Sequence, residues 1–354
     1  MIFPKKKFFK KRGTAIFGKY RIKNGERGKF VFHKTKKISN LTYIKRKFVI
    51  QLILASILMA IYLPLNRFLI FSESHMIEAT PALTSEIFCI SALLVFLPFF
   101  KLKLFTKKIF FRLFAIGSVE FGLMSIFAQL SLKFLEGHVV ALLMLTTPIY
   151  MFLIEGFSLK KGQYLRFFIT FIIVLISIIG WVIYESFFES DAQKNLQFSL
   201  NFKGILFTQL SNISFAIGQV LLKKFFEKTK KMPVICASPV LYLGATIMCM
   251  PLALSSIFIP KLTIPSMSCV LSLLVFGIIF FGVAQYLWNI GIAKTNIRTV
   301  SVLSNLQIPM AVIISGMVFK ENVSQRTFAL ALVLMCVMLV LGLSTHKNLI
   351  ADNV

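Results

Sequence analysis

Long, uninterrupted blocks of apolar residues are the feature that most constrains how this chain can fold. Ten such blocks follow one another between residues 48 and 343. About 20 apolar residues on a helix cross about 30 Å of hydrocarbon, and only helices and closed barrels satisfy their own backbone polar groups in lipid. The sequence lacks the ten-residue alternation that is typical of barrels. We therefore predict an all-α integral membrane protein with ten transmembrane helices.

Short polar or charged segments separate the predicted spans. The spans cover residues 48–69, 80–100, 109–131, 137–157, 164–184, 204–222, 234–259, 269–290, 297–319 and 327–343. Basic residues test this count, because Lys and Arg accumulate in cytoplasmic loops. With the N-terminus inside, 33 of the 40 Lys and Arg residues fall in cytoplasmic segments. The charges thus favour ten spans, with both termini in the cytoplasm.

Residues 1–47 form a basic region of their own. They hold 17 of the Lys and Arg residues, one acid, and no apolar block that could span a membrane or act as a secretory signal. One interpretation is a disordered basic tail. Another is adhesion to anionic lipid, at about 1 kcal/mol per basic residue near the surface. We expect no nucleic-acid binding, because the segment shows no recognisable fold or motif for it.

Two segments suggest that the chain is built twice. Residues 128–148 and 288–309 each contain a polar or aromatic helix end, a short turn, a Val-rich helix start and a later proline. Five spans per half make the second half enter from the opposite side, which gives an inverted repeat. The predicted organisation is a cytoplasmic tail (1–47), a first repeat (48–184), an external linker (185–202), a second repeat (203–344) and a cytoplasmic tail (345–354).

These two segments resemble the drug/metabolite transporter superfamily, specifically its ten-helix EamA-like branch. Pro148 and Pro309 match the two family prolines, which we expect to act as structural helix breaks, and Glu321 falls near the family's Gly-Glu position. The sequence departs from the pattern at Lys320, where glycine is usual. The resemblance covers residues 48–344 and implies transport of a small metabolite by alternating access, without a cofactor.

Polar residues inside the hydrocarbon are costly and are therefore candidates for a site. Glu120 lies about eleven residues into the third span, on the order of 16 Å at 1.5 Å per residue and close to the midplane. Glu86 lies roughly 9 Å into the second span by the same rise. Either carboxyl could bind a proton or a cationic substrate, or could only hold neighbouring helices together. Glu155, at the cytoplasmic end of the fourth span, is interpreted as structural.

Further polar and aromatic side chains could line a cavity between the spans. They are Tyr62, Asn66, Gln209, Asn212, Gln219, Gln285, Tyr286, Trp288, Asn289, Asn305 and Gln307. Gln209, Asn212 and Gln219 share one helical face by their spacing. Hydrogen bonding between helices explains such a stripe about as well as contact with a substrate does.

The absence of Lys and Arg deep in the spans argues against a phosphate-bearing substrate. We predict a secondary transporter for an amino acid, an amine or an S-adenosylmethionine-like cationic or zwitterionic solute, in a bacterial inner (plasma) membrane. Alternatives are an exporter of metabolites or drugs, a membrane-embedded enzyme or a channel. Metal-spaced clusters, HExxH and GxSxG are missing from the sequence, so neither a metal nor catalysis is expected. The sequence is compatible with a homo-oligomer.

Overall fold

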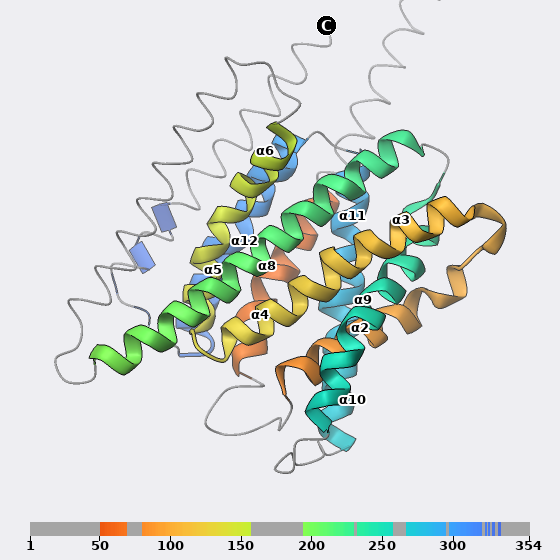
Figure 1. The fold of residues 1–354 in the computed structure, drawn as a ribbon. Helices are drawn as coiled ribbons and strands as arrows, with labels where there is room; N and C mark the ends of the chain where they lie inside the picture. Colours follow the sequence, from red (N-terminus) through yellow and green to blue (C-terminus); the bar gives the residue numbers. More distant parts are fainter. Residues whose placement is uncertain are drawn as a thin grey trace, which may run out of the picture. The chain divides into compact units, whose positions relative to one another are not determined.

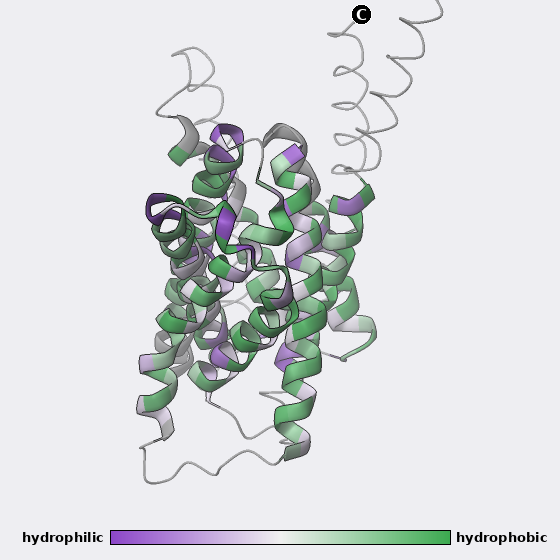
Figure 2. Ribbon diagram, turned by 90° about the vertical axis from the view of Figure 1, so that its right-hand side faces the viewer, coloured by the Kyte–Doolittle hydropathy of each residue, from purple (hydrophilic) through white to green (hydrophobic). Residues whose placement is uncertain are grey.

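The computed structural model describes residues 50–68, 80–156, 194–229, 232–257, 267–294 and 297–320, together with positions 323, 325, 328, 329, 332 and 333. Apart from turns and short connections, these residues are helical, and no strand occurs among them. Hydrophobic residues dominate the helices (Figure 2). Six of the described helices are long and apolar enough to cross a membrane. The described part of the chain is therefore all-helical, as expected for a multi-pass membrane protein.

The helices follow the predicted spans closely (Figure 1). They are Ile50–Phe68, α2 (Pro81–Phe96), α3 (Lys107–Gly117), α4 (Met124–Leu132), α5 (Gly137–Leu143), α6 (Thr147–Gly156), α8 (Lys194–Lys228), α9 (Val234–Ile257), α10 (Met267–Phe276), α11 (Gln285–Lys294) and α12 (Ile297–Met317). The fifth predicted span, most of the tenth and both predicted tails lie outside the described residues. The total of ten spans therefore stays a prediction.

Helix α8 begins earlier than expected, at Lys194, within the segment predicted as the linker 185–202. The difference has a simple cause. Hydropathy marks only the apolar part of a helix, whereas the first residues of α8 are rich in Lys, Asn and Gln. The apolar, membrane-length part of this helix begins at Phe202, close to the predicted boundary.

Two of the long helices each contain a π-helical segment. A π-helical segment, Ser118–Leu123, joins α3 to α4, and another, Gly277–Ala284, joins α10 to α11. Gly117 and Gly122 frame the first segment, and Gly277 and Gly282 occur 160 residues later in the second. Such π-bulges change which side chains face a neighbouring helix and are frequent at functional sites.

Each π-helical segment packs on a helix from the other half of the chain. Helix α3 and the first π-helical segment pack on α9, whereas the second π-helical segment packs on α2. The α2–α9 pair itself forms a central contact, and α5 packs on α12. Figure 1 shows α3 and α4 running as one long helix beside α8 and α9.

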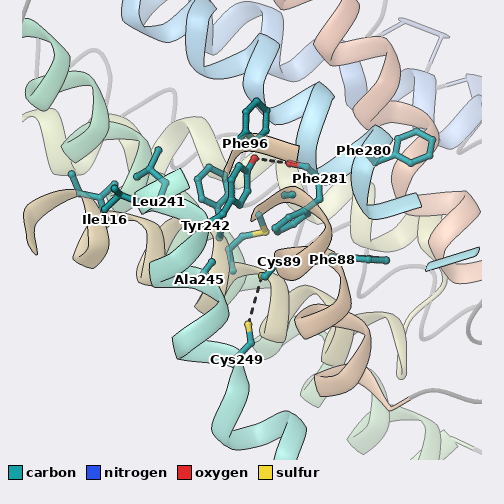
Figure 3. Packing of buried hydrophobic residues seen from close by; sticks show 14 of the residues in the cluster. Phe88, Cys89, Phe96, Ile116, Leu241, Tyr242, Ala245, Cys249, Phe280 and Phe281 are labelled. Carbon is teal, nitrogen blue, oxygen red and sulfur yellow. Dashed lines mark hydrogen bonds between the residues drawn. The ribbon is translucent and has the colours of Figure 1, made fainter. Parts of the chain in front are cut away.

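Aromatic side chains fill the core between α2, α9 and the two π-helical segments (Figure 3). Tyr242 stacks on Phe96 with ring centroids 5.7 Å apart, and its hydroxyl donates to the carbonyl of Phe281 at 2.6 Å. The sulfur atoms of Cys89 and Cys249 meet at 3.9 Å between α2 and α9. These contacts join the two halves of the bundle in its interior.

Glycines let α3 and α9 touch backbone to backbone. A Cβ on Gly117 would overlap the Leu241 carbonyl, and a Cβ on Gly244 would overlap the Phe114 carbonyl. Ser118 closes the contact by donating to the Gly244 carbonyl at 2.9 Å. Small residues at such interfaces permit close approach of helices that gain no hydrophobic energy from leaving lipid.

We expect Gly244→Ala to destabilise the protein by about 1–3 kcal/mol, because the added methyl group must push two backbones apart. Thermal unfolding in detergent measures the loss. Gly282→Ala is the matched control, since the nearest atom to its Cβ would be 3.6 Å away. Equal stability of the two variants would show that the α3–α9 contact is looser than described.

The orientation of the chain can be tested at two engineered cysteines in a variant without native cysteines. Ser190, which lies outside the described residues, is predicted to be external, whereas Lys228 ends α8 on the predicted cytoplasmic side. An impermeant thiol reagent should label a cysteine at Ser190 from outside and should spare one at Lys228. Labelling of both from the same side would contradict the predicted topology.

Candidate functional site

A cavity of about 750 Å³, a volume that includes space open to solvent, lies between the helices. Its wall comes from the helix Ile50–Phe68, from α4 to α6, α8, the second π-helical segment, α11 and α12. Most of the wall is soft and apolar, with the side chains of Met59, Met124, Met144, Phe215, Phe280 and Phe281. Met and aromatic side chains make an adaptable surface for an organic molecule.

Polar groups on the wall are few and uncharged. They belong to Tyr62, Thr147, Gln285 and Gln307. Among the described residues that line the cavity there is no Asp, Glu, Lys, Arg or His. The cavity can therefore offer a solute apolar contacts and neutral hydrogen bonds.

Tyr62 is one of the predicted residues that does line the cavity. Its ring lies 5.5 Å from that of Phe276 and 6.3 Å from that of Phe280, measured between centroids. Its hydroxyl accepts a long hydrogen bond of 3.4 Å from Gln129. Tyr62 thus presents an aromatic face and a weakly engaged hydroxyl at the cavity.

Gln285 is the second predicted residue on the wall, and Gln307 joins it there. Gln285 is only 6% exposed, and its side-chain oxygen has no hydrogen-bond partner. The side-chain oxygen of Gln307 is likewise buried without a partner. Because the two residues belong to α11 and α12, neighbouring helices bring these amides to one cavity.

Gln209 and Asn212 do not line the cavity. They form hydrogen bonds to the chain around Pro148, where the regular helix is interrupted. Pro148 has no N–H, and just before it the Thr147 N–H bonds to the Met144 carbonyl in a 3₁₀ turn. The Leu143 carbonyl that this turn releases accepts from Asn212 at 3.0 Å instead. The hydroxyls of Thr146 and Tyr150 donate to Gln209 at 2.8 and 2.9 Å. For Gln209 and Asn212 the structure therefore favours hydrogen bonding between helices over contact with a substrate.

Glu120 lies in the middle of the first π-helical segment and is fully buried. One of its carboxyl oxygens accepts from the Gln219 amide, whose oxygen in turn accepts from the Trp288 indole at 3.0 Å. A Cβ on Gly218 would overlap the Glu120 side chain, so α8 lies directly against it. The second carboxyl oxygen has no hydrogen-bond partner. Glu120 thus joins three helices, and it does not line the cavity.

The other predicted residues are more scattered. Glu86 is 6% exposed on α2, and Asn66 is buried in the helix Ile50–Phe68; neither lines the cavity. Asn305 belongs to α12, but its side chain lies outside the described part of the chain. Pro309 is buried within α12 and directly follows the cavity residues Gln307 and Ile308.

Sequence reasoning missed the Met and Phe residues that form most of the wall. In a span, an apolar side chain that faces a cavity looks the same as one that faces lipid. The glycine spacing around the two π-helical segments was a usable signal, since Gly117 and Gly122 recur as Gly277 and Gly282. Phe280 and Phe281 of the wall lie between the second pair.

Comparison with known proteins places the chain among membrane transporters in sequence similarity. Residues 202–343 match the EamA-like transporter family. The chain is 27% identical to the biotin transporter of Salmonella typhimurium over 232 residues, which cover 65% of this chain and 73% of that one. It is also 27% identical to the biotin transporter of Escherichia coli K12 over 240 residues, covering 67% and 75% of the two chains.

A solved crystal structure has the same fold. It aligns with a TM-score of 0.55 and 16% sequence identity, over 85% of this chain and 99% of that one. The family match and the biotin transporters support a helical membrane transporter of small metabolites. The match of residues 202–343 to the EamA-like transporter family agrees with the resemblance to the EamA-like branch of the drug/metabolite transporter superfamily.

Proposed function

We propose that this chain is a secondary transporter that moves a small, largely apolar metabolite across a bacterial inner membrane by alternating access. The cavity is the observation that carries the proposal. Its wall combines Tyr62 and Met144 from the first half of the chain with Phe280 and Gln285 from the second. A solute bound between elements of the two halves can be exposed to either side when one group of helices moves against another.

The packing supports an inverted repeat of five helices with five. The π-helical segment of the first half packs on α9, and that of the second half packs on α2. This exchange of partners is what a two-fold relation between the halves requires. The glycine pairs at a constant separation of 160 residues support the same relation, as do Pro148 and Pro309.

For the substrate we propose a biotin-like compound. Biotin joins a cyclic urea to a thioether ring and carries a carboxylate on a short alkyl chain. The thioether and alkyl parts suit the Met and Phe side chains of the wall, and the urea suits its neutral polar groups. The biotin transporters among the relatives support this choice.

A cationic solute is the second candidate. Tyr62, Phe215 and Phe280 present aromatic rings to the cavity, and such rings attract organic cations. No charged side chain of either sign lines the described wall, so neither an organic cation nor the carboxylate of biotin is neutralised there. The cationic class ranks second because it lacks the urea that the neutral amides can match. Amino acids, amines and S-adenosylmethionine-like compounds are therefore competitors in the experiment.

Counterflow into proteoliposomes tests the proposal. Vesicles loaded with unlabelled biotin should take up external labelled biotin transiently above equilibrium, and they should do so with saturation. Vesicles loaded with an amino acid or an amine should show no such effect. Vesicles without protein give the passive rate. Saturable exchange of none of these solutes by folded protein would contradict the proposed function.

A further inference from the structure

We propose that the cavity recognises a cyclic urea, and that Gln285 and Gln307 bind its two edges. This inference rests on the proposed function, because it assigns the group by which that cavity selects its solute. It begins from a contrast among the buried amides. Gln209, Asn212 and Gln219 all make hydrogen bonds to neighbouring helices. The side-chain oxygens of Gln285 and Gln307 have no partner among the described residues, and both residues line the cavity.

Leaving a buried hydrogen-bonding group unpaired costs about 1–3 kcal/mol. Other buried amides also have unpaired atoms, but none of them lines the cavity; they belong to Gln51, Asn66, Gln129, Asn212 and Asn289. Among the described amides, only the two glutamines are therefore placed for a ligand. Their chemistry limits what that ligand can be. Each primary amide offers one oxygen acceptor and N–H donors in one plane.

A cyclic urea carries a carbonyl flanked by two N–H groups. Each of its two edges therefore pairs an N–H donor with the shared carbonyl oxygen. One primary amide can meet one edge with two hydrogen bonds, by accepting from the N–H and donating to the carbonyl. Two glutamines on neighbouring helices can thus satisfy both edges of one ring, and the uncharged wall accommodates it without a counter-ion.

The apolar part of the wall accounts for the rest of the ring system. Met59, Met124 and Met144 offer polarizable thioethers, and Phe280 and Phe281 offer ring faces. Sulfur–aromatic contacts contribute about 0.3–1.5 kcal/mol each. This surface favours a compact apolar ring fused to the urea but makes no bond that requires its sulfur. Recognition of the urea should therefore outweigh recognition of the thioether.

Binding of biotin analogues to the purified full chain tests this assignment. Desthiobiotin keeps the urea and loses the ring sulfur, and we expect its affinity to stay within about tenfold of that of biotin. An analogue methylated on both urea nitrogens should bind at least about tenfold more weakly, because it cannot donate to the two amide oxygens. Gln285→Met and Gln307→Met should each weaken biotin binding about tenfold and should narrow the difference between biotin and the methylated analogue.

Gln209→Met is the matched control, since Gln209 bonds to Thr146 and Tyr150 outside the cavity wall. This variant should keep the preference for the unmethylated urea, whatever happens to its stability. Equal competition by biotin and its methylated analogue in the wild-type protein would overturn the assignment while leaving transport intact. Transport of amino acids or amines without biotin binding would overturn it as well. Failure of all solutes in counterflow would instead reject the proposed transport function.

Discussion

Glu120→Gln should yield a folded protein that still exchanges substrate for substrate but no longer accumulates it against a gradient. The carboxyl lies in the bundle interior, apart from the cavity, and one of its oxygens has no partner. It is thus placed to bind and release a proton while the substrate occupies a separate site. Glutamine keeps the size and the oxygen that accepts from Gln219 but cannot titrate. We expect gradient-driven uptake to fall more than about tenfold and its pH profile to flatten.

Glu86→Gln is the matched control for this variant. Glu86 is also buried, apart from the cavity, and has an unpaired carboxyl oxygen. It lies on α2, outside the chain of hydrogen bonds through Gln219 and Trp288 that links Glu120 to α8 and α11. Its replacement should leave the pH profile of uptake unchanged. Wild-type rates and pH dependence in purified Glu120→Gln would show that this carboxyl only holds α8 and α11 in place through Gln219 and Trp288.

Met144→Trp should abolish substrate binding without unfolding the protein. Met144 reaches the cavity from the 3₁₀ turn before Pro148 and is half-buried, so an indole can extend into the open volume. Filling the space should lower affinity by more than about a hundredfold, because a solute would have to displace a packed ring. Isothermal calorimetry with biotin measures the loss.

Met250→Trp provides the comparison. Met250 is 47% exposed on α9 and lies outside the cavity wall, so the same replacement there meets lipid. Binding should be unchanged in this variant. Undiminished binding in Met144→Trp would place the substrate elsewhere in the bundle.

The sequence was sufficient to locate the helices that the structure describes, because a span must be apolar over its whole length. The predicted boundaries at residues 80, 137 and 234 fall within one residue of the starts of α2, α5 and α9. Hydropathy says nothing of the hydrogen-bond register inside a helix. It therefore gave no sign of the π-helical segments, and it placed the start of α8 at Gly204 instead of Lys194.

The site was only partly predictable, because polarity identifies a buried group but not its partner. Tyr62 and Gln285 were expected at a cavity and line one. Asn212 looked similar in sequence, yet it bonds to the Leu143 carbonyl that the helix break releases. Phe280 and Met59 could not be separated from lipid-facing residues without knowing which helices are neighbours.

The glycine contacts have a consequence for motion during transport. Where Gly117 meets Leu241 and Gly244 meets Phe114, two backbones touch and no layer of side chains lies between them. Changes of side-chain rotamer cannot make room for one helix to slide along the other at such a contact. We therefore expect α3 and α9 to move together as one rigid body. The displacement that opens and closes the cavity must then occur at other helix contacts, such as that between α5 and α12. Spin labels on α3 and α9 should accordingly keep a constant distance throughout the cycle.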